Sequence, residues 1–208
     1  MGDARDVGER VTGLVLAAGD SRRLGRPKQL LPYGDATLLD HTLDTARACG
    51  FDQLLCVLGG GSAAIRESVD LSGVEVLENH EFATGCSSSI AAALGAVDPA
   101  ADALVLLLGD QPGVTRETVA ALLAGRGDAP VAVCSYDDGR GHPLVFARST
   151  FPDLEGLHGD KGVWKLLDRR AQDVVGVPIP GRGPADVDTW EDYEAVLAES
   201  GSSSDSSA

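Results

Sequence analysis

One stretch near the start of the chain restricts the possible folds more than any other. Residues 11–17 are almost continuously apolar, which is typical of a parallel strand buried on both faces, and the run stops at Gly19. A small, glycine-punctuated loop follows, in which the backbone can approach a ligand and successive N–H groups can cradle phosphates. The loop concentrates cations in a chain of net charge −15, which indicates an anionic ligand and most simply a nucleoside triphosphate. These cations are Arg22, Arg23, Arg26 and Lys28.

The loop differs from both common phosphate-binding motifs. It lacks the Gly-Lys-Ser/Thr ending of a P-loop and the G-x-G-x-x-G of a dinucleotide site. Residues 16–28 instead resemble the L-A-A-G-x-S-x-R-x-G-x-x-K signature of the MobA-like nucleotidyltransferases. The continuation P-K-Q-L-L-P, residues 27–32, is most similar to the molybdenum cofactor cytidylyltransferase branch. The alternative is a plain strand–loop joint with solvated arginines, which the number of matched positions disfavours.

Length and composition narrow the class of protein. A chain of 208 residues with 43% hydrophobic residues is long enough for one sizeable α/β domain, and no linker divides it. The balance of 32 acids against 17 bases argues against nucleic acid or an anionic membrane surface as the main partner. The four cysteines are widely spaced without a C-x-x-C pair, so they indicate small buried thiols rather than a zinc or redox site.

The two ends of the chain are expected to lie outside the domain. Residues 1–10 are charged and polar, which predicts a flexible leader rather than a signal peptide. Residues 11–199 are predicted to form the nucleotidyltransferase domain, and the serine-rich residues 200–208 a disordered tail. No apolar run approaches the length of a membrane span, so a cytoplasmic protein is expected.

Strand-like and helix-like segments alternate along the first two thirds of the chain. This alternation predicts right-handed crossovers and a parallel sheet. The resemblance implies a single three-layer α/β/α domain with a mostly parallel sheet, the GT-A-like, Rossmann-like nucleotidyltransferase fold. The expected strands are 11–17, 54–58, 74–77, 104–108 and 174–177, and the expected helices are 37–48, 62–69, 90–97, 116–123, 163–168 and one beginning near 189. Residues 131–136 and 143–146 break this rhythm and predict a hairpin beside the sheet, around a turn at 137–141.

A small-residue segment after the third predicted strand is a second candidate for the nucleotide site. A helix cap accounts for at least one serine of 87–89, and a helix N-terminus is also an anion site. Gly85 and Ser89 match the family pattern of a glycine followed by a serine-rich helix start near the nucleotide. Asn79, in the loop that leaves the third strand, is included among the expected nucleotide-binding residues.

Asp110 is the strongest single candidate for a metal ligand. It follows an apolar strand in the tetrapeptide G-D-Q-P, at the edge where open α/β sheets bind ligands. A cap role for it is weakened because Thr115 can cap the next helix. The resemblance implies that this Asp holds the catalytic Mg²⁺. Asp188, in the segment D-V-D-T-W-E-D, is either a second metal ligand or an ordinary acid at a helix start.

The acceptor side of the site is less well marked. Gly141-His142-Pro143 resembles a G-H-P stretch of the family, and His142 is either a substrate contact or a turn residue. Asp160 and Lys161 lie in a G-D-K-G loop that in the family often continues with Ala-Arg, whereas Val163-Trp164 follows here. Trp164 is interpreted as core packing in preference to a stacking platform for a pterin.

The resemblance implies transfer of a nucleotidyl group from an NTP, with CTP favoured, to a phosphorylated pterin-type acceptor bearing molybdenum. Arg22 and Lys28 would bind the triphosphate and the departing pyrophosphate, and Asp110 would hold the metal. The backbone of Leu16, Ala17, Ala18 and Gly19 would approach the base and phosphates. A molybdenum hydroxylase is a further candidate partner. The alternatives are a guanylyltransferase, a sugar- or alcohol-phosphate nucleotidyltransferase or a glycosyltransferase on the same fold, and a non-catalytic chaperone that delivers cofactor to a molybdenum hydroxylase.

Overall fold

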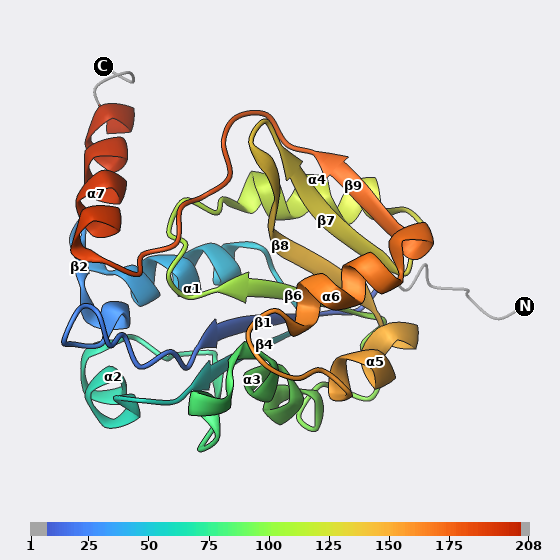
Figure 1. Cartoon of the computed structure of the whole chain (residues 1–208), viewed down its shortest axis with the longest axis horizontal. Helices are drawn as coiled ribbons and strands as arrows, with labels where there is room; N and C mark the ends of the chain where they lie inside the picture. The colour runs from blue at the N-terminus through green and yellow to red at the C-terminus, as the bar shows by residue number, and fades with distance from the viewer. Residues whose placement is uncertain (1–7, 205–208) are drawn as a thin grey trace, which may run out of the picture.

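The sheet is organised around its first strand, β1 (Val11–Ala17), in a computed structural model that describes residues 8–204. β1 pairs in parallel with β4 (Gln53–Leu58) on one side and with β6 (Ala103–Leu108) on the other. The seven strands lie in the order β5-β4-β1-β6-β8-β7-β9 (Figure 1). The other strands are β5 (Glu75–Glu78), β7 (Val131–Tyr136), β8 (Gly139–Ala147) and β9 (Val174–Pro178), with a separate small hairpin of β2 (Pro32–Tyr33) and β3 (Ala36–Thr37). Within the seven-stranded sheet of the described residues, only β8 runs against its neighbours, so the predicted, mostly parallel sheet is confirmed.

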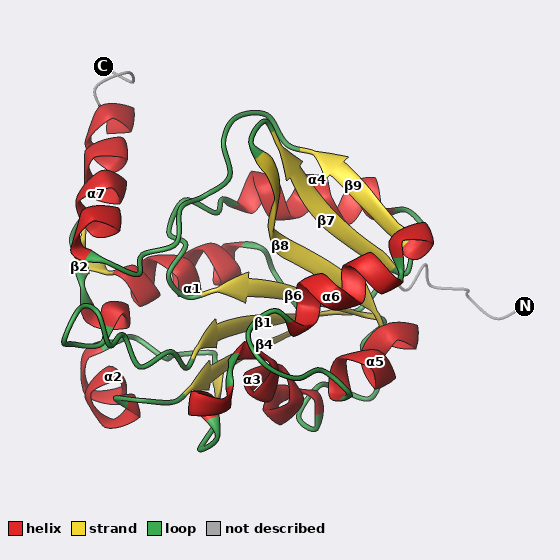
Figure 2. Ribbon diagram, viewed as in Figure 1, coloured by secondary structure: helices red, strands yellow, loops and turns green. Residues whose placement is uncertain are grey.

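Helices cover both faces of the sheet and form the outer layers of a three-layer α/β/α domain (Figure 2). They are α1 (Leu38–Ala48), α2 (Ser62–Ser68), α3 (Cys86–Leu94), α4 (Arg116–Arg126), α5 (Phe151–Glu155), α6 (Gly162–Arg169) and α7 (Trp190–Ser204). Short 3₁₀ turns lie at η1 (Lys28–Leu30), η2 (Phe82–Thr84), η3 (Arg148–Thr150) and η4 (Ala171–Asp173).

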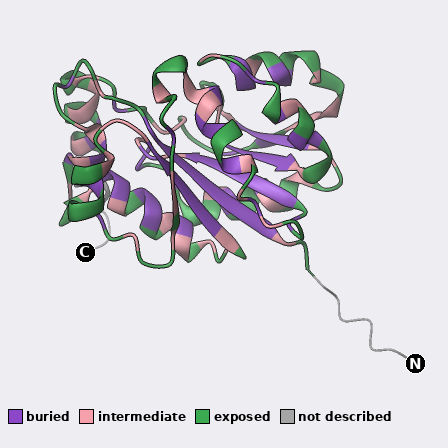
Figure 3. Cartoon of the chain, turned by 90° about the horizontal axis from the view of Figure 1, so that it is seen from below, coloured by how far each residue is buried: buried purple, intermediate pink, exposed green. Residues whose placement is uncertain are grey.

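Alternating side chains of the strands supply two apolar clusters, one on each face. Val15 and Ala17 point into the cluster that packs against α1, α2 and α4. Leu14 and Leu16 point into the other cluster, which packs against α3, α5 and α6. This period-2 division is what a strand buried on both faces requires. In Figure 3 the strands are purple along most of their length, whereas the helices are largely exposed on their outer faces.

The predicted hairpin at residues 131–146 is part of the main sheet and does not lie beside it. Its second strand is longer than predicted, because β8 begins at Gly139 and leaves a two-residue turn where residues 137–141 were expected to form one. β8 joins the main sheet because Leu144, Val145 and Phe146 are fully buried, and the backbone of a buried strand needs hydrogen-bonding partners on both sides. β8 therefore pairs antiparallel with β6 as well as with β7.

Helix ends follow the local sequence closely in two cases. Thr37 forms a capping box with Asp40 at the start of α1, and Thr115 caps α4 as predicted. Gly50, which follows the C-cap residue Cys49 of α1, has a φ of 70°, which glycine adopts without strain.

The structure describes part of each predicted end of the domain. α7 continues to Ser204, into the tail predicted for residues 200–208. Arg10, assigned to the flexible leader, is tied to the domain through Asp98 and Asp102. Residues 1–7 and 205–208 lie outside the described residues. Within residues 8–204 no helix combines the length and apolar character needed to cross a bilayer.

Gly59, at the end of β4, should tolerate no larger residue. A Cβ at this position would lie 2.5 Å from the carbonyl oxygen of Ala18 and 2.8 Å from Cβ of Phe82. We expect Gly59→Ala to lower the free energy of unfolding by about 1–3 kcal/mol, because backbone must move to relieve the contact. Gly95→Ala is the matched control, since nothing lies within 4 Å of its Cβ and its backbone is helical. Urea denaturation that gives both variants the same stability would contradict this account.

Candidate active site

A cleft of about 620 Å³ opens at the carboxyl ends of β1 and β6. The chain leaves β1 toward β4 and β5 and later returns to β6 on its other side, so this edge is the topological switch point where open α/β sheets bind ligands (Figure 1). Twelve of the predicted site residues line the cleft: Leu16, Ala17, Ala18, Gly19, Arg22, Lys28, Gly85, Ser89, Asp110, His142, Asp160 and Asp188. Asn79 and Lys161 are not among its lining residues.

The loop that follows β1 is held in shape by its own side chains. Gln29 is buried, and its amide Nε2 donates to the carbonyl oxygens of Ala17 (2.7 Å) and Gly19 (3.1 Å). Ser21 Oγ accepts a hydrogen bond of 2.9 Å from the backbone N–H of Lys28. The loop therefore keeps its position beside the strand end without a ligand. Sequence reasoning missed Gln29, although it stands in the P-K-Q-L-L-P segment.

Lys28 lies between two carboxylates that are remote in sequence. Its ammonium donates hydrogen bonds to Asp110 Oδ2 and, over 2.7 Å, to Asp188 Oδ1. The side chains of Lys28 and Asp110 are only 12% and 15% exposed, whereas that of Asp188 is 51% exposed. Burial by itself lowers the pKa of Lys28, but the charge of Asp110 and the hydrogen bonds to both carboxylates outweigh it and hold the pKa above its ordinary value. Lys28 therefore keeps its positive charge in the cleft.

The segment that carries Asp188 is anchored to the end of β6. The backbone N–H of Val187 donates to the carbonyl oxygen of Asp110 (3.2 Å), and the side chain of Val187 is fully buried. Gln111 Nε2 donates to Asp186 Oδ1 (2.8 Å) and to the carbonyl oxygen of Pro184 (3.3 Å). With Val187 turned into the interior, Asp186 and Asp188 on either side of it both line the cleft.

Asp186 is a cleft residue that sequence reasoning did not assign. Burial raises its pKa above the ordinary value, and the nearby charge of Asp110 acts in the same direction. Its spacing of two from Asp188 was a usable signal, because alternate residues of an extended segment face the same side.

The carboxylates of Asp110 and Asp188 fit a hard divalent cation. Both already converge on one positive charge, the Lys28 ammonium. Mg²⁺ usually takes one or two protein carboxylates and completes its octahedron with water and substrate phosphates. Among residues 8–204 no group of three or more His, Cys, Asp or Glu side chains is arranged as metal donors.

The amino end of α3 is organised differently from the prediction. The helix begins at Cys86, so the serines at 87–89 lie inside it, and the N-cap is Gly85 without a side-chain cap. The expectation that one of these serines caps the helix is therefore wrong. The backbone N–H of Cys86 donates instead to Asp160 Oδ1 (3.1 Å), and a Cβ on Gly85, whose φ is 114°, would lie 2.8 Å from the same carboxylate oxygen. The Asp160 carboxylate occupies this helix N-terminus.

Two predicted site residues lie behind or beside the cleft. Asn79 is buried, and its Nδ2 donates to the hydroxyls of Ser88 (2.8 Å) and Ser89 (3.0 Å), so it supports the wall from behind. Lys161 is exposed at the residue before α6.

Cys86 lines the cleft, and burial raises the pKa of its thiol to about 11, so the thiol is protonated near neutral pH.

His142 and Trp164 form an aromatic wall of the cleft. Their rings meet edge to face with centroids 5.5 Å apart. His142 lies within β8 and not in a turn, and burial lowers its pKa to about 4, so the imidazole is neutral at pH 7. Trp164 packs against the apolar cluster of α3, α5 and α6 as interpreted from the sequence, and it also lines the cleft.

The arginines of the loop lie further out than Lys28. Arg22 is 76% exposed at the rim, where its Nε bonds Asp20 Oδ2 over 2.7 Å. Arg23, which occupies the arginine position of the signature, also lines the cleft. Arg26 is directed away, with its guanidinium 5.6 Å from the centre of the Trp190 ring.

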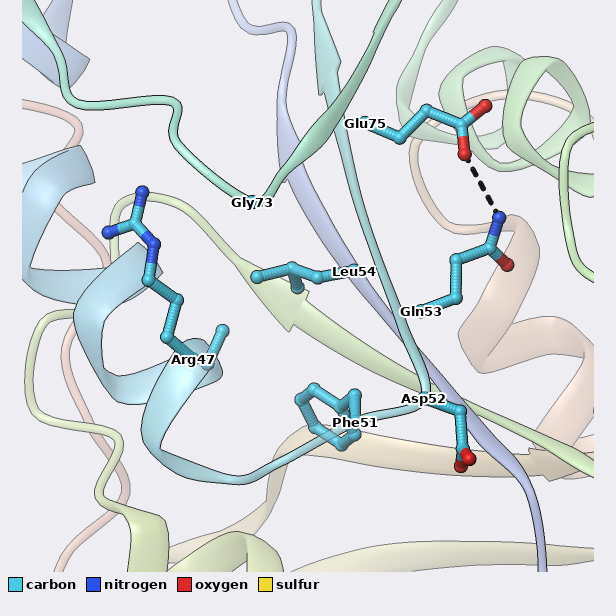
Figure 4. Close-up of a pocket in the computed structure, with 8 residues that line it drawn as sticks. Arg47, Phe51, Asp52, Gln53, Leu54, Gly73 and Glu75 are labelled. Carbon is cyan, nitrogen blue, oxygen red and sulfur yellow. Dashed lines mark hydrogen bonds between the residues drawn. The ribbon is translucent and has the colours of Figure 1, made fainter.

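A second hollow, of about 400 Å³, lies at the opposite end of β4 (Figure 4). Its polar side chains are paired within the fold: Gln53 Nε2 donates to Glu75 Oε2 (3.0 Å), and Asp52 accepts from the backbone N–H of Val11 (2.9 Å). It contains none of the predicted site residues and lies at the amino ends of the parallel strands. The switch-point cleft is the better candidate for an active site.

The family of the chain follows from this fold and site together with its relatives. Residues 13–174 match the model of the MobA-like NTP transferase domain. The chain therefore belongs to the MobA-like NTP transferase family, and the predicted resemblance is confirmed. It is a nucleotidyltransferase by family.

Relatives extend along almost the whole chain. The protein named nicotine blue oxidoreductase of Paenarthrobacter nicotinovorans is 32% identical, over 90% of this chain and 96% of that protein. The purine catabolism protein PucB of Bacillus subtilis (strain 168) is 30% identical, over 88% of this chain and 94% of that one.

Solved structures share the fold. The Mycobacterium tuberculosis Rv0371c homologue from Mycobacterium sp. strain JC1 is 50% identical with a TM-score of 0.85, over 91% of this chain and 96% of that one. Rv0371c of Mycobacterium tuberculosis H37Rv, in a crystal structure described as a complex with manganese, is 45% identical with a TM-score of 0.80, over 91% of this chain and 98% of that one. A divalent metal has thus been observed with a relative of the family.

His142 should remain neutral well below the ordinary histidine range. Its folded pKa of about 4 lies below the unfolded value of 6.5, so the neutral form stabilises the fold. This contribution is present above pH 6.5 and is lost as the pH falls toward 4. NMR titration of the four histidines should show one that titrates near 4, and His142→Gln should remove that signal. The unfolding free energy of the parent should also fall relative to the variant between pH 6.5 and 4. A His142 that titrates near 6.5 would contradict the burial argument.

Proposed function

We propose that the protein is a Mg²⁺-dependent cytidylyltransferase that moves CMP from CTP to a phosphorylated, molybdenum-bearing pterin and releases pyrophosphate. The convergence of Lys28, Asp110 and Asp188 at the switch-point cleft is the observation that carries the proposal. It brings together a permanently charged lysine and two carboxylates beside a glycine-containing loop, which are the groups that a metal-bound triphosphate needs. The resemblance of P-K-Q-L-L-P to the cytidylyltransferase branch supports CTP as the donor.

The donor would lie along the loop from Ala17 to Lys28. The small residues Ala17, Ala18 and Gly19 line the cleft and let the base and phosphates approach the backbone. Lys28, charged because of its raised pKa, would neutralise the phosphates, and Arg22 at the rim would contact the outermost phosphate oxygens.

The transfer needs no nucleophile from the protein. An oxygen of the acceptor phosphate would attack the α-phosphorus of the nucleotide, and the bond from that phosphorus to the oxygen bridging the β-phosphate would break. The bonding electron pair leaves with pyrophosphate, so negative charge accumulates on the departing group. Lys28, whose side chain is only 12% exposed, would stabilise this charge. Mg²⁺ held by Asp110 and Asp188 would supply Lewis-acid stabilisation and alignment of the phosphates.

The acceptor would lie against His142 and Trp164. A neutral imidazole does not attract a phosphate by charge, but the imidazole and indole together offer an aromatic wall suited to a flat heterocycle such as a pterin. Trp164 stands near the place where the family often has a cation, so this wall would replace charge with ring contacts in acceptor recognition. A molybdenum hydroxylase would receive the product.

Donor and acceptor specificity can be tested together. Pyrophosphate release is measured with CTP, GTP, ATP and UTP, each with molybdenum-loaded molybdopterin, a sugar phosphate or an alcohol phosphate. We expect the highest rate with CTP and the pterin. Preference for GTP would overturn the choice of base, and preference for a simple phosphate would overturn the acceptor. Binding of nucleotide without any turnover would favour a chaperone.

Asp110→Asn should separate folding from catalysis. The amide keeps the size of the side chain but loses the charge that attracts a metal, so turnover should fall by about 100-fold or more while the circular dichroism spectrum is unchanged. Asp188→Asn should cost less, because Asp188 is half exposed. Asp128→Asn, at an exposed position outside the cleft, is the control and should keep the parental rate. Near-normal turnover of Asp110→Asn would remove the support for a metal at this residue.

A further inference from the structure

The ammonium of Lys28 occupies the place where the two candidate metal ligands meet. One oxygen of Asp110 and one of Asp188 accept its hydrogen bonds, and the Lys28–Asp188 distance is 2.7 Å. Mg²⁺ bound by the same oxygens would require distances of about 2.0–2.1 Å. A divalent ion that took the ammonium's position between these oxygens would displace both hydrogen bonds. The two cations also repel each other at this range.

Two of the other loop cations have different partners. Arg22 pairs with Asp20, and Arg26 lies over Trp190. Asp186, the third acid of the cleft, accepts from Gln111. Among residues 8–204, the ion pairs of Asp110 and Asp188 are both with Lys28.

We propose that Lys28 competes with the divalent metal, holding the metal's place in the nucleotide-free protein and leaving it when a triphosphate provides new partners. The inference rests on the proposed function in that a metal and a triphosphate use this site. Metal binding then depends on nucleotide: the phosphates take over the ammonium, and the two carboxylates are freed for the ion that arrives with them.

The local structure permits this exchange without a loop rearrangement. The backbone of Lys28 is fixed by the hydrogen bond from its N–H to Ser21 Oγ, so only the side chain has to move. Its four-carbon stem is flexible, and its Cε lies beside Gly19, at 3.8 Å from where a Cβ would be. The ammonium can therefore swing from the carboxylates toward the loop that is expected to bind phosphates.

The test measures Mn²⁺ binding to the nucleotide-free protein by electron paramagnetic resonance of the free ion. Mn²⁺ is the probe because a relative has been crystallised with manganese. We expect Lys28→Gln to bind Mn²⁺ at least about tenfold more tightly than the parent, because a unit positive charge beside the ion is removed. Arg26→Gln is the matched control, which removes a cation of the same loop that faces Trp190, and it should leave the affinity within about twofold. Unchanged or weaker Mn²⁺ binding by Lys28→Gln would overturn the proposal.

A measurement on the parent protein covers the case in which Lys28→Gln does not fold. The chain has three lysines, so ¹⁵N-lysine labelling gives three side-chain ammonium signals. We expect Mg²⁺ to shift or broaden the signal of Lys28 and to leave those of Lys161 and Lys165 unchanged. A Lys28 signal that stays constant at Mg²⁺ concentrations that displace bound Mn²⁺ would contradict competition.

Neither measurement uses a nucleotide or an acceptor. If Lys28→Gln tightens Mn²⁺ binding but no NTP and acceptor pair turns over, the competition stands and the proposed reaction fails. If transfer from CTP occurs but the Mn²⁺ affinity of Lys28→Gln does not rise, the proposed reaction stands and the competition fails.

Discussion

The pairing of β1 with a parallel neighbour on each side is the constraint on which the rest of the structure depends. Because β4 and β6 both run parallel to β1, the chain must leave to one side and return to the other, and the connections part at the carboxyl end of β1. The backbone N–H of Gly109 donates to the carbonyl oxygen of Leu16 (2.9 Å), so the two strands end at the same level. The backbone pairing thereby places the cationic loop and Asp110 at one edge of the sheet, independently of their side-chain contacts.

A third, small apolar cluster ties the last part of the chain to that edge. Its buried members are Leu24, Leu31, Leu38, Val187 and Val196. They come from the cationic loop, α1, the segment before α7 and α7 itself. Since Asp188 is half exposed, its ion pair with Lys28 contributes little to stability, and burial of these side chains supplies the energy that keeps the segment in place. The ion pair then decides which charges face one another in the cleft.

Local patterns predicted most of the helices and strands, and they predicted the site residues that directly follow β1 and β6. The apolar run of β1, the glycine and cations after it, and the acid after β6 could each be read from neighbouring residues. The caps at Thr37 and Thr115 were predictable for the same reason, since a cap contacts only the next turn of its own helix. Local patterns were insufficient at the start of α3. The serines after Gly85 were predicted to cap this helix, but Asp160 from a distant loop accepts the hydrogen bond of its first backbone N–H.

The sequence by itself determined the family, the alternation of strands and helices, and the residues at each strand end, because these depend on short-range periodicity and on contiguous motifs. Only the tertiary structure decided that β8 joins the main sheet and that Asn79 supports the wall from behind. It also decided the partners of Lys28, which lie 82 and 160 residues away along the chain. The physical reason is that such contacts depend on how the sheet closes and on where a buried Val187 turns its neighbours. No local pattern encodes either.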